Sequence, residues 1–393
     1  MKPDVFFSLE RPDAATLERQ WTELEERADI NFYLSWAWIG SWIEEAGPPD
    51  LVLAGRAGGE LVCLGLLRRG VQKRHLFVRS QMLFLHQTGD EEQDVIFIEY
   101  NDFLTDRRFA PLGSAAVAFL LENAGRVDEI QIGGVAEPIY EGVKAAGFTT
   151  HVYARKPTAF VDLKDIRASG GDYLATLSPN SRYQIRRSHK AYQARGPLAV
   201  QPARNAEEAL EFFEALGVLH ERAWRERGGR GGWRLSFNAL PERMWRRREP
   251  GGAWRFPFLV AFQKRVIDRA FAKGGIEIVR ISCGDTPIGY IHCLVRDGWI
   301  GSYLSGFAYE ADNKLKPGLT SFYLYIEEKL KGDAQVIDFL AGDERYKTSL
   351  GQPGPSICWF RVQERRPQLR LESALRRVKR RAEKLLGLRR PAD

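Results

Sequence analysis

The chain has 393 residues, is 44% hydrophobic and 28% charged, and carries a net charge of +7. This composition excludes a disordered chain, and the length favours two domains with a core each. The sequence has no long apolar run and no signal-peptide pattern, which favours a cytoplasmic protein without a membrane span. Its four cysteines form no CxxC pair, which argues against a disulfide scaffold or a bound metal.

Helix-like and strand-like patterns alternate in the first part of the chain. A tryptophan-rich helical pattern around Trp21 and Trp42 comes first. Strand-like runs follow at 51–54 and 61–67, then an apolar run at 110–121, a strand at 130–133, a short helix ending near Gly147 and a strand at 158–163. This alternation predicts an α/β unit over residues 1–167.

Turn-forming residues at 168–172 predict the boundary of a second unit, residues 168–364. Ser178 followed by Pro179 is typical of a helix start, with a capping hydroxyl and a first-turn proline. The further elements are a helix at 206–224, a Gly/Arg-rich connection at 227–232, strands at 276–282, 287–295 and 299–307, a helix at 318–331, a strand at 335–340, a short helix from Asp343 and a strand at 357–362. The fold class is α/β (α+β), with mixed and mostly antiparallel sheets flanked by helices.

Four segments of the second unit resemble a known group of enzymes. They are Leu177–Arg182, Leu219–Trp224, Pro317–Leu319, and Asp338–Gly342 followed by Tyr346 and Lys347. In this order they resemble the BioF2-like acetyltransferase branch of the GNAT superfamily, which is related to the Fem-type peptidoglycan aminoacyltransferases. The resemblance covers roughly residues 20–362 and implies two tandem GNAT-like domains, with the acyl donor bound mainly by the second.

The predicted donor site lies at the start of the helix at 318–331. Free N–H groups at a helix start bind anions, and nearby lysines add positive charge. The candidate donor contacts are Lys314, Lys316, Gly318, Leu319 and Thr320. This segment has one glycine where ordinary GNAT enzymes have an Arg/Gln-x-x-Gly-x-Gly/Ala loop, so the resemblance leaves open whether acyl-coenzyme A or aminoacyl-tRNA is the donor. An ordinary helix turn with solvated lysines is the other interpretation.

Acyl transfer needs a base for the acceptor, donors for the oxyanion and an acid for the leaving group. The resemblance implies that Tyr346 is the acid and that a backbone N–H supplies the oxyanion contact, either near a bulge between Tyr290 and Leu294 or on the following strand. Lys347 would stabilise the oxyanion or hold a phosphate. Asp338 and Glu344 are the candidate carboxylates. A structural role for each of these side chains is the alternative.

The candidate acceptor contacts are Arg182, Arg186, His220, Trp224 and Tyr303. Arg182 and Arg186 share one helix face with Lys190, because residues four apart are neighbours on a helix. Such a face would hold a phosphorylated acceptor, a sugar nucleotide or the ribose phosphate of the donor, or would only be solvated. A lone helical histidine such as His220 is more often a packing residue.

The positive charge is concentrated at the C-terminal end. Residues 365–390 contain eleven Lys or Arg and two Glu, so this segment carries +9 and the remainder of the chain −2. Leu371, Leu375 and Val378 recur at helical spacing, which predicts a basic amphipathic helix over 365–393. It would pack on the body, lie on an anionic membrane surface or contact tRNA.

The predicted function is transfer of an acyl group, with acetyl first, from acyl-coenzyme A to an amine or hydroxyl of a sugar, amino acid or envelope precursor. The resemblance also suggests polysaccharide biosynthesis as the setting. A Fem-type aminoacyltransferase that uses charged tRNA is the second hypothesis. A non-catalytic binding protein on a GNAT scaffold is the third.

Overall fold

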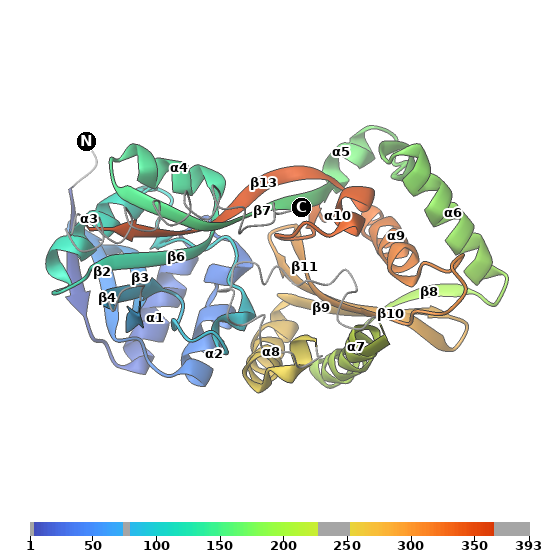
Figure 1. The fold of residues 1–393 in the computed structure, drawn as a ribbon, viewed down its shortest axis with the longest axis horizontal. Helices are drawn as coiled ribbons and strands as arrows, with labels where there is room; N and C mark the ends of the chain where they lie inside the picture. Colours follow the sequence, from blue (N-terminus) through green and yellow to red (C-terminus); the bar gives the residue numbers. More distant parts are fainter. Residues whose placement is uncertain (1–3, 74–78, 227–251, 365–393) are drawn as a thin grey trace, which may run out of the picture.

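The computed structural model describes residues 4–73, 79–226 and 252–364 (Figure 1). Its first half contains β1 (Val5–Glu10), α1 (Ala14–Glu25), α2 (Trp36–Ala46), β2 (Leu51–Ala57), β3 (Glu60–Lys73), β4 (Arg79–Leu85), β5 (Leu104–Thr105), α3 (Gly113–Asn123), β6 (Glu129–Ala136), α4 (Glu137–Ala145) and β7 (Thr149–Asp162). The sequence predicted most of these elements but not β1, β4 or β5.

The second half begins with α5 (Leu163–Ala168), α6 (Pro179–Gln193), β8 (Leu198–Pro202), α7 (Ala206–Glu226) and α8 (Pro257–Ala270). It continues with β9 (Ile276–Cys283), β10 (Thr286–Arg296), β11 (Trp299–Phe307), α9 (Pro317–Leu330), β12 (Val336–Asp338), α10 (Arg345–Leu350) and β13 (Gln352–Gln363). The sequence did not predict α5, β8 or α8. The Gly/Arg-rich connection and the basic segment 365–393 lie outside the described residues.

The strands form one continuous mixed sheet in the order β1-β2-β3-β4-β6-β13-β7-β12-β11-β10-β9-β8, with β5 paired to β3. The pairs β4–β6 and β11–β12 are parallel, and the other pairs along this path are antiparallel. The predicted fold class, a mostly antiparallel mixed sheet flanked by helices, is confirmed.

The last strand of the sheet joins the two predicted units. Strand β13 follows α10 in the sequence but lies between β6 and β7, where it pairs antiparallel with both. Figure 1 shows β7 and β13 as long neighbouring strands that run from one half of the molecule into the other. The predicted boundary at 168–172 falls in the turn after α5. The division into two domains stays a prediction, because the sheet is continuous across it.

Helices cover both faces of the sheet (Figure 1). In the second half, α5, α6, α9 and α10 lie on one face, and α7 and α8 lie on the other. The largest core contains side chains of α1, α2, α7 and α8, so one body of apolar side chains unites both halves on this face. Within it, the rings of Trp38 and Phe262 meet edge to face with centroids 4.8 Å apart. The two halves are therefore packed against each other.

The start of α6 is capped as the sequence predicts. The Ser178 hydroxyl accepts a hydrogen bond from the Ser181 N–H at 3.2 Å, and Pro179 occupies the first turn. We expect Ser178→Ala to lower the free energy of unfolding by about 1 kcal/mol, because one N–H of the first turn loses its acceptor. Urea unfolding measures the change. Ser178→Asp keeps an acceptor and should unfold like the wild type, and an equal loss in both variants would contradict a capping role.

Candidate active site

An opening in the sheet forms where the parallel strands β11 and β12 part. In the described part of the sheet, their ladder ends at the pair Gly301–Asp338, while β11 continues to Phe307. On its other edge β11 has a bulge opposite β10, because His292 pairs with Leu304 and Cys293 with Ser302, which leaves Tyr303 as the extra residue. The family resemblance implied a bulge between Tyr290 and Leu294, on the facing strand β10. Bulges disrupt the ladder and re-aim side chains beside active sites.

A small cavity lies at this opening. Its lining residues come from the segment before β5, from α8, from β11 and from the stretch between β12 and α10: Val95, Phe97, Glu99, Leu259, Ser302, Tyr303, Leu304, Phe339, Leu340, Ala341, Glu344, Tyr346 and Lys347. The volume of about 50 Å³ gives room for a few water molecules or for one small reacting group. Both halves of the chain therefore build one site.

Glu99 is the buried carboxylate that the first half brings to the cavity. Its Oε2 accepts a hydrogen bond from the Ala341 N–H at 2.8 Å. Burial raises the pKa of Glu99 to about 7, although the bond from Ala341 and the charge of Lys347 act in the opposite direction. A carboxylate with a pKa near neutrality suits a general base. The sequence analysis missed this residue, although an acidic residue directly after Ile96-Phe97-Ile98 is a signal for a buried carboxylate.

The backbone around Glu99 is held in an unusual conformation. Phe97 and Tyr100 have φ angles of 44° and 52°, in the left-handed region that non-glycine residues rarely adopt. The Asn101 N–H donates to the Gly134 carbonyl at 2.9 Å. Gly134 also has a positive φ, and a Cβ there would lie 1.9 Å from the Ile98 carbonyl oxygen. Packing against β6 therefore fixes the segment that carries Glu99.

Asp338 is held by several protein donors in this geometry, and its predicted catalytic role stays a prediction. It accepts hydrogen bonds from the Tyr100 hydroxyl, from the Trp299 Nε1–H at 3.3 Å and from the Leu340 N–H at 2.7 Å. Only 5% of its surface is exposed, and burial raises its pKa. Its oxygens are thus engaged by protein donors, and it ties the end of β12 to the residue next to Glu99.

Lys347 and Glu344 are a second pair of charged side chains that line the cavity. The Lys347 ammonium donates to the Leu340 and Ala341 carbonyls at 3.2 and 2.8 Å and lies 3.1 Å from Glu344 Oε2. Lys347 therefore mainly stabilises the turn after β12, and little of its hydrogen-bonding capacity is left for an oxyanion. Glu344 Oε2 therefore has the Lys347 ammonium as its charged partner, and Glu344 lines the cavity beside it.

Two tyrosines complete the lining. The Tyr346 ring stacks on Phe322 with centroids 5.7 Å apart, and burial raises its pKa well above the ordinary value, so the hydroxyl stays protonated at neutral pH and can act as an acid. The Tyr303 hydroxyl donates to the Ile96 carbonyl at 2.7 Å. Tyr303 therefore lines the cavity with its ring and backbone, while its hydroxyl is already bound.

The predicted donor residues lie at the start of α9, on the face of the sheet that α6 also covers. Lys314 is exposed, and Lys316, Gly318 and Leu319 are partly exposed. The Thr320 side chain is fully buried and its hydroxyl is 2.7 Å from that of Ser188, so its predicted contact with the donor stays a prediction. The exposed part of the predicted donor site is therefore the segment 314–319.

His220 is buried in the structure, and its predicted contact with the acceptor stays a prediction. Its Nε2 accepts from the Ala253 N–H and its Nδ1 is 3.2 Å from the Ser305 carbonyl, so both ring nitrogens have protein partners. Burial lowers its pKa to about 4, which keeps the ring neutral. The structure thus holds the ring by both of its nitrogens. Trp224 lies partly buried near the end of α7 and does not line the cavity.

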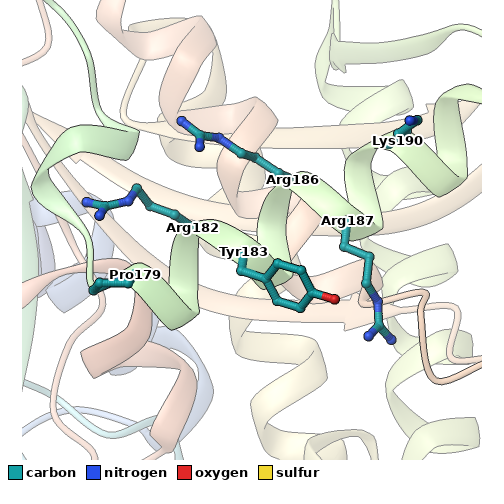
Figure 2. Close-up of a pocket in the computed structure, with 6 residues that line it drawn as sticks. All are labelled: Pro179, Arg182, Tyr183, Arg186, Arg187 and Lys190. Carbon is teal, nitrogen blue, oxygen red and sulfur yellow. The ribbon is translucent and has the colours of Figure 1, made fainter.

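Arg182 and Arg186 lie apart from the cavity. They line a surface groove of about 510 Å³ along α6, together with Pro179, Tyr183, Arg187 and Lys190 (Figure 2). The cavity and this groove share no lining residue. The structure therefore does not bring these arginines to the acceptor side of the site.

None of the helices in the described residues is long and apolar enough to cross a membrane. Within the same ranges, no group of three His, Cys, Asp or Glu side chains is placed to hold a metal ion.

Comparisons with known proteins define the class of the second half. Residues 179–348 match the family model of an acetyltransferase (GNAT) domain, so this segment is a GNAT-type domain, and the resemblance to that superfamily is confirmed. The crystal structure of FemX shares the fold, with a TM-score of 0.55 at 11% identity over 93% of this chain and 99% of that chain.

Two further solved structures are less similar. The C-terminal domain (DUF2156) of a putative lysylphosphatidylglycerol synthetase from Agrobacterium fabrum has a TM-score of 0.49 at 12% identity, covering 92% of this chain and 94% of that chain. L-PGS from Bacillus licheniformis has the same TM-score and identity, covering 94% and 97%. No curated protein matches the sequence.

Proposed function

We propose that the protein is an N- or O-acyltransferase that moves an acyl group from acyl-coenzyme A to an amine or hydroxyl of a sugar, an amino acid or an envelope polysaccharide precursor. The observation that carries this proposal is the opening between β11 and β12, with Glu99 and Tyr346 on its walls. Acetyl is the first choice of acyl group, because residues 179–348 match an acetyltransferase domain and the cavity at the opening is small.

The opening suits the extended arm of coenzyme A. After Gly301, β11 is no longer paired with β12 in the described residues. The backbone groups on this edge, apart from the Ser305 and Phe307 carbonyls, which have partners within the protein, would meet the two amides of the pantetheine arm. The start of α9 lies beyond this edge, where the N–H groups of Gly318 and Leu319 and the charge of Lys316 would hold the diphosphate. The thioester would then lie beside the bulge at Tyr303.

The chemistry follows from the groups around the cavity. Glu99 takes the proton from the acceptor nitrogen or oxygen as that atom attacks the thioester carbonyl. A backbone N–H of the bulge at Tyr303 stabilises the oxyanion of the tetrahedral intermediate. When the intermediate collapses, the carbon–sulfur bond breaks and Tyr346 donates its proton to the departing thiolate. The proton on Glu99 then leaves with solvent, and solvent reprotonates Tyr346, which restores both groups.

A second candidate function is aminoacyl transfer from charged tRNA. The observation that favours it is the row of basic side chains on α6, which complements a nucleic-acid backbone. In either function a peripheral membrane contact of the segment 365–393 stays a proposal. A non-catalytic binding protein is the remaining alternative, which inactivity of the wild type toward both donors would favour.

Calorimetric titration with acetyl-coenzyme A tests the donor. We expect saturable binding by the wild type and at least a tenfold loss in Gly318→Trp, because a side chain there fills the start of α9 and meets the Phe307 ring, which already lies 3.2 Å from an ideal Cβ. Gly332→Trp is the matched control at the other end of α9, where a Cβ has space. Total tRNA is the competitor. Binding of tRNA without binding of acetyl-coenzyme A would contradict the proposed donor.

A further inference from the structure

A basic surface with an exposed tyrosine at its centre runs along α6. Figure 2 shows Arg182, Arg186 and Lys190 on one side of the helix and Arg187 on the other, with the Tyr183 ring between them. Tyr183 is 61% exposed, which is unusual for a large aromatic side chain. A second groove, of about 360 Å³, lies on the Arg187 side of Tyr183 and is lined in addition by Asn180, Gln184, Asn313, Lys314 and Lys316. We call the side chains of both grooves the α6 surface.

The α6 surface collects positive charge that the other described residues do not neutralise. Within these ranges Arg186 and Lys190 have no ion-pair partner. Arg182, Arg186 and Lys190 are spaced by about 6 Å along the helix, since each residue adds about 1.5 Å. The second groove adds Arg187, Lys314 and Lys316. Cations on both sides of a stacking ring are the arrangement that binds nucleotides, whose bases stack and whose phosphates pair with the charges.

The α6 surface is held firmly against the start of α9. The Ser188 hydroxyl accepts from the Lys316 N–H at 2.8 Å and lies 2.7 Å from the Thr320 hydroxyl. Arg187 Nη2 donates to the Asn313 side chain at 3.2 Å. The segment 313–316 is therefore shared between the second groove and the start of α9. A ligand whose diphosphate lies at the start of α9 would place the group attached to that diphosphate near Tyr183.

We propose that the α6 surface binds the 3′-phosphoadenosine end of coenzyme A, with the adenine stacked on Tyr183 and the 3′-phosphate held by Arg187 and Lys314. This inference deepens the proposed function and rests on it, because it takes the diphosphate position from the donor site. The protein would then recognise coenzyme A by its 3′-phosphate as well as by its diphosphate.

Calorimetry with coenzyme A and 3′-dephospho-coenzyme A as paired probes tests this inference. The wild type should bind coenzyme A at least tenfold more tightly than the dephospho form, since each charge-assisted contact to a phosphate adds to the affinity. The double variant Arg187→Gln/Lys314→Gln should bind both equally and no more tightly than the wild type binds the dephospho form. Tyr183→Ala should weaken both by about tenfold, as expected for loss of base stacking. Arg204→Gln removes an exposed arginine of the Arg204–Glu208 pair elsewhere and should change neither affinity.

The outcomes separate this inference from the proposed function. Equal binding of the two probes by the wild type, with no effect of the α6 variants, would overturn the inference and leave the coenzyme A donor in place. Absence of binding of both probes, with tRNA bound by the wild type and lost in the same variants, would overturn both and make α6 an RNA contact.

Discussion

Replacing Glu99 by glutamine is expected to lower kcat by about 10²- to 10³-fold, the range for losing a general base. The carboxylate lines the cavity and its Oε2 is held by the Ala341 N–H. Glutamine keeps an acceptor for that N–H, so the fold and the donor affinity should be preserved. The loss should therefore appear in kcat and not in the binding of acetyl-coenzyme A.

The pH dependence gives a second measurement on the same variant. The base works only when deprotonated, so wild-type kcat/KM should rise with pH through an apparent pKa near 7. Glu99→Gln should lack this rise. Burial raises the folded-state pKa above its ordinary value of 4.5, so the folded protein keeps a proton that the unfolded chain has lost, and the contribution of Glu99 to stability falls as the pH rises between these values. At pH 8 the glutamine variant should consequently be more stable than the wild type, which a misfolded protein would not be.

Glu344→Gln is the matched control, since Glu344 also lines the cavity, beside the Lys347 ammonium. We expect it to lose less than tenfold in kcat and to keep the rise in kcat/KM with pH. The reverse result, with the rise absent only in Glu344→Gln, would assign the base to Glu344 as the sequence suggested.

Asp338→Ala is expected to lower the free energy of unfolding by about 3 kcal/mol. The change removes the acceptor of the Tyr100 hydroxyl, the Trp299 Nε1–H and the Leu340 N–H, and each buried donor left unsatisfied costs roughly 1–3 kcal/mol. We expect a loss near the lower end of the total for these three donors. Burial raises the pKa of Asp338, which means that its charged form already costs energy in the fold.

Urea unfolding measures this loss, with Asp333→Ala, an exposed position before β12, as the control. Asp338→Asn should be intermediate, since an amide N–H₂ group would then face a donor N–H. If Asp338→Ala were as stable as the wild type but inactive, the Asp338 carboxylate would act on the substrate, as its predicted catalytic role requires.

The elements that the sequence predicted well are those set by local signals. The start of α6 follows from Ser178 and Pro179. The bulge was implied only by the family resemblance, and its extra residue, Tyr303, lies on β11 opposite the implied stretch of β10. Glu99 was missed because its function depends on Ala341, which is 242 residues away in the sequence. The two partners of His220, the Ser305 carbonyl and the Ala253 N–H, could not be predicted either, because they come from other elements. Side-chain roles set by distant neighbours cannot be derived from local pattern.

The position of β13 also bears on how the protein is made. Residues 352–363 insert between β6 and β7, so the sheet of the first half stays incomplete until nearly the whole described chain has been synthesised. Until then the nascent chain carries β-strand edges without their final partner, and such edges are prone to pair with other chains. The sheet is closed by its most distant segment, and pairing over such long sequence separations is slow. Completion of the sheet thus waits for the synthesis of β13, and shortening the chain at 351 would remove a central strand of the sheet.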